Sequence, residues 1–320
     1  MMKTINRILI INYFLITSLS GITPTNTSDM YNVFFDAKTH ALGGAHLVQS
    51  MSLHDVIALD SYHTKNKILF SYLNQFSGIN YMNISYVIKD TDSQKIGLSL
   101  VTRSIDDFHT GGFIDTNGDE IPQLNEINYS DIDYYNHREY NFILMKSMIK
   151  NGKSFGFKFK TNLTSIYQSK AYGLSVDFGA QGQINSLGYG ILINNAFSYK
   201  YWDTGQSYWT RPSIIFAGSY TKNKAKVFLD LRIQNINSFN ELDILNAVGL
   251  DFSIAKNFNI RIGKTSLKSI VLGFGFTTDT VEINYAYNPN LFDNMFGQAH
   301  QISILLTLSK LEKIKEVILP

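Results

Sequence analysis

The C-terminal third of the chain is built from short segments in which large apolar side chains alternate with small or polar ones. The clearest segments are residues 225–234, 247–254, 270–277, 281–287 and 301–308. Successive side chains of a β-strand point to opposite faces, so a period of two predicts strands with one apolar and one polar face. A soluble β-sandwich has the same alternation, so the pattern alone leaves open what the apolar face contacts.

The composition favours lipid as the neighbour of that apolar face. Charged residues make up 17% of the chain, against roughly a quarter in ordinary soluble domains. The 19 Tyr and 22 Phe suit the aromatic girdles of outer-membrane barrels. A net charge of +2 gives no case for a nucleic-acid partner. The absence of Cys excludes disulfides, thiol catalysis and Cys-based zinc sites.

The N-terminus has the features of a secretory signal peptide, which we expect to span residues 1–20. Lys3 and Arg7 precede an apolar run, and Ser18 and Ser20 have the small-residue spacing of a cleavage site. An uncleaved anchor is the alternative, although the run is shorter than the roughly twenty residues of a spanning helix. No later segment is apolar enough for such a helix. A membrane location therefore requires a closed β-barrel, which satisfies the backbone polar groups in lipid.

Alternation over the rest of the chain brings the number of expected strands to fourteen. We predict strands at residues 67–73, 80–88, 95–103, 138–149, 153–163, 170–183, 187–196, 212–221, 225–234, 245–254, 258–263, 269–277, 280–287 and 300–308. Six short connections then fall at one end, and generally longer ones fall at the other. Outer-membrane barrels have short periplasmic turns and longer outer loops. The sequence therefore predicts an all-β fold, a transmembrane antiparallel β-barrel of about 14 strands.

In such a barrel the large apolar set of each strand would face lipid and the other set would face the lumen. The second set carries charges of both signs, which are costly against mid-bilayer lipid but can form ion pairs in a wet interior. The predicted lumen-facing charges are Arg103, Lys160, Asp177, Asp230, Arg232, Asp251, Arg261 and Glu282. Lys146 and Lys158 fit this pattern less well, and we expect them near strand ends.

Three segments, in order along the chain, resemble the PorV/PorQ and FadL-like outer-membrane proteins. Residues 36–45 resemble the N-terminal signature of that family, residues 171–195 its middle motif, and residues 281–303 its ending. The Asn-Pro-Ala sequence of the family is replaced here by residues 55–59, Asp-Val-Ile-Ala-Leu. The core of the first motif, which the resemblance places in a plug, is Ala41, Leu42, Gly43, Gly44 and Ala45.

The resemblance implies a barrel with an N-terminal segment plugging its lumen. The expected organisation is a signal peptide at 1–20, a plug at 21–65, an outer-membrane barrel at 66–308 and a tail at 309–320. The function expected first is a PorV-like component of type IX secretion at the bacterial outer membrane, with a secretion-system or secreted-protein partner. The alternative is a FadL-like transporter for hydrophobic ligands such as fatty acids or hydrocarbons. A soluble secreted β-protein, without contact to outer-membrane lipid, is a third hypothesis.

One connection between predicted strands has the oxygen ligands of a calcium site. Asp115, Asn117 and Asp119 stand at alternate positions, and Glu126 is the twelfth residue counted from Asp115, as in calcium loops. The required glycine is at position 4 rather than 6. An Asn-Gly turn explains the same residues without a metal, so calcium and a polar turn are both kept, and no other cofactor is expected.

A second connection, expected at residues 197–211, is aromatic. Its members Tyr201, Trp202, Tyr208 and Trp209 belong either to the aromatic girdle or to a docking surface for a hydrophobic ligand or a partner. The sequence has no His-Glu-x-x-His pair, no Gly-x-Ser-x-Gly elbow and no phosphate loop. We therefore expect a protein that is not an enzyme.

Overall fold

The computed structural model describes residues 23–25, 33–60, 63–64, 66–75, 78–109, 134–234, 243–264, 270–289 and 298–308. The predicted signal peptide and the predicted C-terminal tail lie outside these residues. The predicted calcium ligands Asp115, Asn117, Asp119 and Glu126 also lie outside them.

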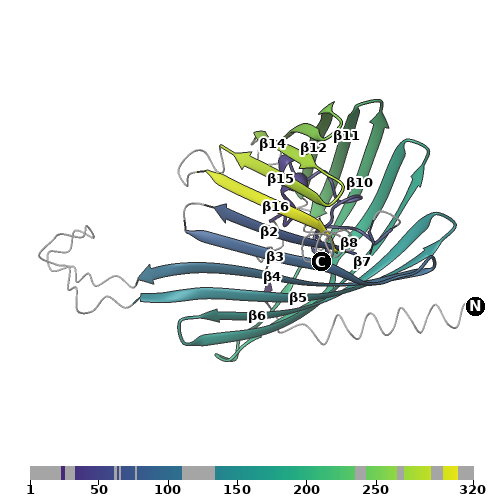
Figure 1. The fold of residues 1–320 in the computed structure, drawn as a ribbon. Coiled ribbons are helices and arrows are strands. Elements are labelled where there is room, and N and C mark those ends of the chain that lie inside the picture. The colour runs from purple at the N-terminus through teal and green to yellow at the C-terminus, as the bar shows by residue number, and fades with distance from the viewer. Residues whose placement is uncertain are drawn as a thin grey trace, which may run out of the picture.

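Fourteen antiparallel strands form a closed barrel (Figure 1). Their bounds are β2 Lys67–Gln75, β3 Ile79–Asp90, β4 Gln94–His109, β5 Tyr134–Lys150, β6 Lys153–Ile166, β7 Ser169–Ile184, β8 Leu187–Trp202, β10 Ser213–Lys222, β11 Ala225–Gln234, β12 Asp243–Ala255, β13 Phe258–Lys264, β14 Ile270–Thr277, β15 Val281–Asn288 and β16 Ala299–Thr307. Strand β16 pairs with β2 and closes the wall, with Thr307 opposite Lys67. The prediction of an all-β, 14-stranded antiparallel barrel is confirmed.

Two further short strands extend the sheet from the end of β8. Strand β9, Ser207–Thr210, pairs with the end of β8, and strand β1, Thr23–Thr25, pairs in parallel with β9. The sequence did not predict either of them.

Six tight turns gather at one end of the barrel, which we call the short-turn end. They join β3 to β4, β5 to β6, β7 to β8, β10 to β11, β12 to β13 and β14 to β15. Asn151, Asn185 and Asn223 adopt φ values of 52°, 51° and 52° in three of these turns. Asn tolerates this left-handed region, which tight hairpin turns require. Strand β4 ends and strand β5 begins at the opposite end of the barrel (Figure 1).

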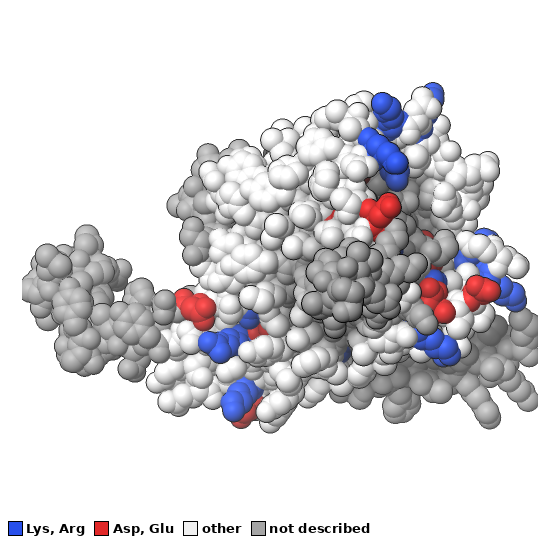
Figure 2. Space-filling model, in the orientation of Figure 1, with Lys and Arg blue, Asp and Glu red and all other residues white. Residues whose placement is uncertain are grey.

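The outward face of the wall is apolar and the inward face is polar. On β6, Phe155, Phe157 and Phe159 are exposed, whereas the alternate residues Lys158 and Lys160 are buried. Figure 2 shows residues without charge over much of the wall, with lysine and arginine gathered mainly toward the short-turn end. Burial of apolar side chains against lipid would stabilise a barrel of this kind in a membrane. In the described part of the chain, no helix is long and apolar enough to cross a membrane.

Residues 33–60, which we call the inner segment, lie against the inward face of the barrel (the purple trace in Figure 1). This segment contains the short helix α2, Ala37–Ala41, whose N-cap Asp36 accepts a hydrogen bond from the Lys38 N–H at 3.0 Å. Further along, Ile57 and its apolar neighbours pack into a buried cluster with Leu192 of β8 and Val87 of β3. The inner segment therefore has its own contacts with strands on several sides of the wall.

Glycines of the wall allow the inner segment to approach very closely. A Cβ on Gly179 of β7 would lie 2.3 Å from the Ile57 carbonyl oxygen. Within the inner segment itself, Gly43 has a φ of +69° and lies against the backbone of Lys264 in the wall, where a Cβ would be 2.6 Å from the carbonyl oxygen. A larger residue at either place would displace the inner segment or the wall.

Candidate functional site

The backbone ladder of the barrel is interrupted along one side of β8. Pairing between β8 and β10 ends at Asn194 opposite Ser213, and pairing between β8 and β9 begins at Lys200 opposite Tyr208. We call the interval the wall break, formed by residues 195–199 and the facing residues 209–212. Hydrogen-bonded pairing continues on both sides of this interval but not across it.

A side chain replaces the missing backbone pairing at the wall break. The Ser198 hydroxyl donates to the Thr210 carbonyl oxygen at 2.9 Å and accepts from the Thr210 N–H at 2.6 Å. A single serine hydroxyl thus satisfies both backbone groups of the facing residue. Because the backbone ladder is interrupted here, separating the two edges over this interval breaks fewer backbone hydrogen bonds than separating a continuous ladder of the same length.

The other side of β8 has a bulge at the same height. In its ladder with β7, Val176 faces Phe197 and Phe178 faces Ile193, so Asp177 is opposite three residues of β8. Such insertions bend the strand and redirect its side chains. The bulge lies where the pairing of β8 with β10 ends, at Asn194.

A buried ion pair fixes the bulge. Lys160 Nζ lies 2.8 Å from Asp177 Oδ1, and both side chains are almost completely buried. The same carboxylate oxygen accepts the N–H of Asn195 at 2.8 Å, and Asn195 has a φ of 53°. Lys160 also donates to the side-chain oxygens of Asn194 and Asn195. These hydrogen bonds join the ion pair to the irregular part of β8, and they offset part of the desolvation of the two charges.

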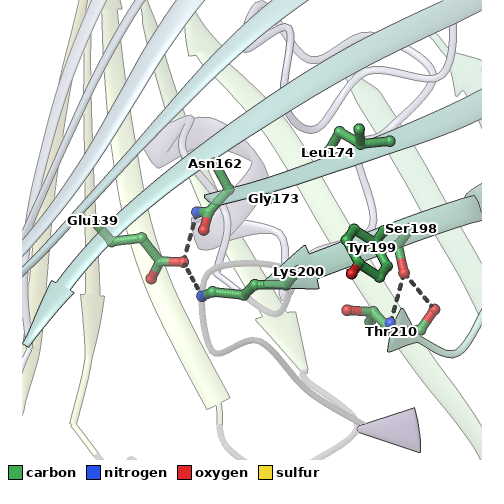
Figure 3. A pocket seen from close by; sticks show the side chains of 8 residues that line it. All are labelled: Glu139, Asn162, Gly173, Leu174, Ser198, Tyr199, Lys200 and Thr210. Atoms are coloured by element: carbon green, nitrogen blue, oxygen red, sulfur yellow. Dashed lines mark hydrogen bonds and ion pairs between the residues drawn. The ribbon is translucent and has the colours of Figure 1, made fainter. Parts of the chain in front are cut away.

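A pocket lies beside the wall break (Figure 3). It is lined by Glu139, Asn162, Gly173, Leu174, Ser198, Tyr199, Lys200 and Thr210. The Glu139 carboxylate accepts a hydrogen bond from Asn162 at 2.7 Å and lies 3.6 Å from Lys200 Nζ. Arg103 Nη1 lies 3.7 Å from the second oxygen of Glu139. One carboxylate therefore holds two cations on the inward side of the pocket.

The lining combines two kinds of surface. Leu174 of β7 and Tyr199 of β8 are opposite in register, and their Gly173 and Lys200 neighbours have the other orientation. Leu174 is 38% exposed on the apolar face, whereas Glu139 is buried on the polar face. The pocket thus brings polar residues of the interior next to apolar residues of the outer surface.

Two adjacent acids organise the inner segment. Asp55 accepts the Phe35 N–H at 2.8 Å and lies 3.1 Å from His54 Nδ1. Asp36 accepts from Ser303 of the wall at 3.2 Å. Burial raises the pKa of Asp55 to about 7 against the opposing effect of the Phe35 N–H, and burial also raises the pKa of Asp36. Burial lowers the pKa of His40 to about 4. The inner segment therefore holds neutral or half-neutral groups at neutral pH.

The structure places the predicted lumen-facing charges on the inward side and pairs several of them. Arg103 pairs with Glu139, Lys160 with Asp177, and Arg261 Nε with Asp251 at 3.1 Å. Residues buried on this side include Arg103, Lys160, Asp177, Asp230, Asp251 and Arg261, while Arg232 and Glu282 are partly buried. Lys158 was expected near a strand end but is fully buried inside, where it donates to the His54 carbonyl oxygen at 2.8 Å.

The plug motif is buried, and the aromatic connection is not a loop. Ala41, Leu42, Gly43, Gly44 and Ala45 all lie buried within the inner segment. The expected loop at 197–211 was wrong in its bounds, because β8 continues to Trp202 and β9 begins at Ser207. The four aromatics Tyr201, Trp202, Tyr208 and Trp209 therefore stand on strands, next to the wall break.

Sequence reasoning missed Glu139, Asn162 and Ser198 as site residues. The sequence pattern could have indicated them, because each belongs to the inward-facing set of an alternating strand. A buried Glu in such a set requires a partner. The interrupted pairing at Ser198 had no sequence signal of comparable strength. Among the described residues, no three His, Asp or Glu side chains are grouped so that they could hold a metal ion.

No protein-family model and no curated protein sequence matches the chain. Solved structures match its fold. One is the crystal structure of the Pseudomonas putida toluene transporter TodX, with 12% identity and a TM-score of 0.61 over 85% of this chain and 96% of that chain. Another is the TodX monoaromatic hydrocarbon channel deltaS2 mutant, with 12% identity and a TM-score of 0.57 over 87% and 98%. At this identity the likeness shows a common barrel fold, and the resemblance to PorV/PorQ proteins stays a prediction.

Proposed function

We propose that this chain is an outer-membrane channel for small hydrophobic molecules, which leave the barrel sideways through the wall break. The observation that carries the proposal is the interrupted ladder, where the side chain of Ser198 bonds to the backbone of Thr210. The pocket beside it, with Leu174 and Tyr199 next to the buried Glu139, supports the same direction of passage.

A straight path through the lumen is less favourable in this proposal. The inner segment packs against glycines of the wall, such as Gly179 at Ile57, and would act as the plug. The inward face is polar, so the free energy of a hydrophobic solute falls when the solute moves from that face into lipid. Side exit through the wall break shortens the polar part of the path.

The matched structures support a channel rather than an enzyme, since their titles describe a toluene transporter and a monoaromatic hydrocarbon channel. They favour the FadL-like hypothesis over the secretion-system role that was expected first. Location in the outer membrane, after export directed by residues 1–20, belongs to the same proposal. The apolar outward face of the barrel supports it.

The proposal is tested by uptake through an outer membrane. A bacterial host without its own hydrophobic channels would express this chain, and the initial uptake of radiolabelled toluene and of a hydrophilic solute of similar size would be measured. Gly173→Leu places a large side chain in the pocket, where even a Cβ lies 3.3 Å from Asn162 and from the backbone of Tyr199. We expect wild type to raise toluene uptake and Gly173→Leu to abolish most of the gain.

Gly218→Leu is the matched control, because it adds the same side chain on β10, where the nearest atom to a Cβ is 3.7 Å away. Heat-modifiable migration in gel electrophoresis would show that each variant is folded. Equal toluene uptake with and without the chain would contradict the transport proposal. Loss of uptake in both glycine variants would contradict the route through the wall break.

A further inference from the structure

A group of lysines at the short-turn end forms an exposed basic surface that transport does not use. It consists of Lys89 on β3, Lys146 and Lys150 on β5, and Lys153 on β6, all exposed. Among the described residues, none of the four has an ion-pair partner. We call these four residues the lysine patch.

The register of three strands sets two of these lysines in one row on the outer surface. Lys89 is opposite Ile96 of β4, and Ile96 is opposite Lys146 of β5. The next position in the row, opposite Lys146, is Phe157 of β6, whose side chain is exposed on the apolar face. Because neighbouring strands are about 4.8 Å apart, the Cα atoms of Lys89 and Lys146 are about 10 Å apart.

A β-bulge creates this arrangement. The ladder between β3 and β4 shifts between Val87 and Lys89, so that Lys89 joins Ile96 on the outer face. The same shift turns the next residue, Asp90, toward Lys95, with which it forms an ion pair inside the barrel. The bulge therefore puts the cation outside and takes its neighbouring acid inside. Without the shift, Asp90 rather than Lys89 would share the outer face with Lys146.

The rim below this row adds more positive charge. Lys150 and Lys153 are directly opposite each other in the register of β5 and β6. Like charges in such pairs repel unless an anion lies between or beside them. The exposed acid nearest in the chain, Asp92, belongs to the β3–β4 turn and forms no ion pair with the patch among the described residues.

We propose that the lysine patch binds an acidic phospholipid of the membrane leaflet at the short-turn end, with the phosphate between Lys89 and Lys146. The acyl chains would run over Ile96 and Phe157, while the two lysines extend their ammonium groups toward the headgroup level. Basic clusters near a membrane surface attract anionic lipid, and their effect adds per residue. The proposal rests on the membrane location proposed above, but not on which molecule the barrel transports.

The test is lipid binding by the purified full-length chain in a mild detergent, followed by native mass spectrometry. The probes are dioleoylphosphatidylglycerol and dioleoylphosphatidylcholine, which share acyl chains and differ in headgroup charge. Wild type should bind the acidic lipid more tightly. In the double variant Lys89→Gln/Lys146→Gln the preference should fall by about 25-fold, since each lysine near an anionic surface contributes about a fivefold gain.

The control is Lys222→Gln/Lys224→Gln, which removes two exposed lysines from the same end of the barrel but from the β10–β11 turn. This variant should keep most of the preference, and heat-modifiable migration should show that both variants are folded. Equal binding of the two lipids by wild type overturns the proposal. An equal loss of preference in both variants would show that general surface charge attracts the lipid, and it would overturn the specific site at Lys89 and Lys146. Tighter binding of lipid A, the phosphorylated lipid of the opposite leaflet, overturns the assignment of the leaflet.

Discussion

Replacement of Asp55 by Asn should stabilise the inner segment at neutral pH and leave its stability nearly unchanged at pH 4. Asp55 joins the two ends of this segment by accepting the Phe35 N–H, and burial raises its pKa from 3.8 to about 7. A raised pKa means that the folded state favours the protonated carboxyl. The stability contributed by Asp55 is therefore complete below pH 3.8 and is lost as the pH rises to about 7.

The size of the effect follows from the shift. From 3.8 to about 7 is about three pKa units, and each unit corresponds to about 1.36 kcal/mol, so ionisation of Asp55 costs on the order of 4 kcal/mol. An asparagine has nearly the same shape and cannot ionise. Its oxygen can accept the Phe35 N–H, and its amide can donate to the Nδ1 atom of His54, which lies 3.1 Å from an Asp55 oxygen.

Comparison of the two proteins removes the contribution of the histidines. Burial lowers the pKa of His40 to about 4, so this group loses stability as the pH falls from 6.5 toward 4, in the opposite direction to Asp55. The lowered pKa values of His46 and His54 act in the same direction as that of His40. Since wild type and Asp55→Asn contain the same histidines, the difference between them reports mainly on Asp55.

Hydrogen exchange of the peptide that contains the Phe35 amide measures this difference. After correction for intrinsic exchange rates, the opening free energy of Asp55→Asn should exceed that of wild type by under about 1 kcal/mol at pH 4 and by about 4 kcal/mol above pH 7. Asp92→Asn, at an exposed turn residue, is the control and should show no difference. A gain that is the same at every pH, or a loss at neutral pH, would refute the reasoning.

Two substitutions test the packing of the wall in the same heat-modifiability assay. Gly179→Val should lower the transition temperature, because its Cβ would be 2.3 Å from the Ile57 oxygen and overpacking costs about 1–3 kcal/mol. An unchanged temperature would show that the inner segment does not rest on this strand. Lys160→Met should destabilise the barrel by about 3–5 kcal/mol, because it leaves the Asp177 carboxylate buried without its cation at 2.8 Å. Addition of Asp177→Asn to that variant should recover part of the loss, and no recovery would contradict the ion-pair explanation.

The fourteen strands could be predicted because their physical cause is local. Residues such as Phe155, Phe157 and Phe159 point outward at every second position, and this period is visible in any short stretch of these strands. The same period placed Asp177 and Arg103 on the inward face. Lys158 has the same alternation as Lys160 and is likewise buried, so the prediction of a strand end at Lys158 was wrong.

The wall break could not be predicted because its cause is not local. Residues 197–211 are rich in Tyr and Trp and end before Pro212, a composition that fits a loop as well as a strand. The wall break lies beside the bulge at Asp177, and this residue pairs with a buried lysine from another strand, Lys160 of β6. The contacts of the inner segment are also non-local, since the hydrogen-bonded residues Asp36 and Ser303 are 267 positions apart.

The pairing of β16 with β2 constrains the order in which the molecule can assemble. Thr307 and Lys67 face each other across this seam, so the wall cannot close until nearly the whole chain has been synthesised. Contacts between such distant positions form slowly, because a long stretch of chain must first be ordered. The inner segment directly precedes β2, so its last residues are tethered to this seam. The seam between the first and last barrel strands is thus also the place where the inner segment is joined to the wall that surrounds it.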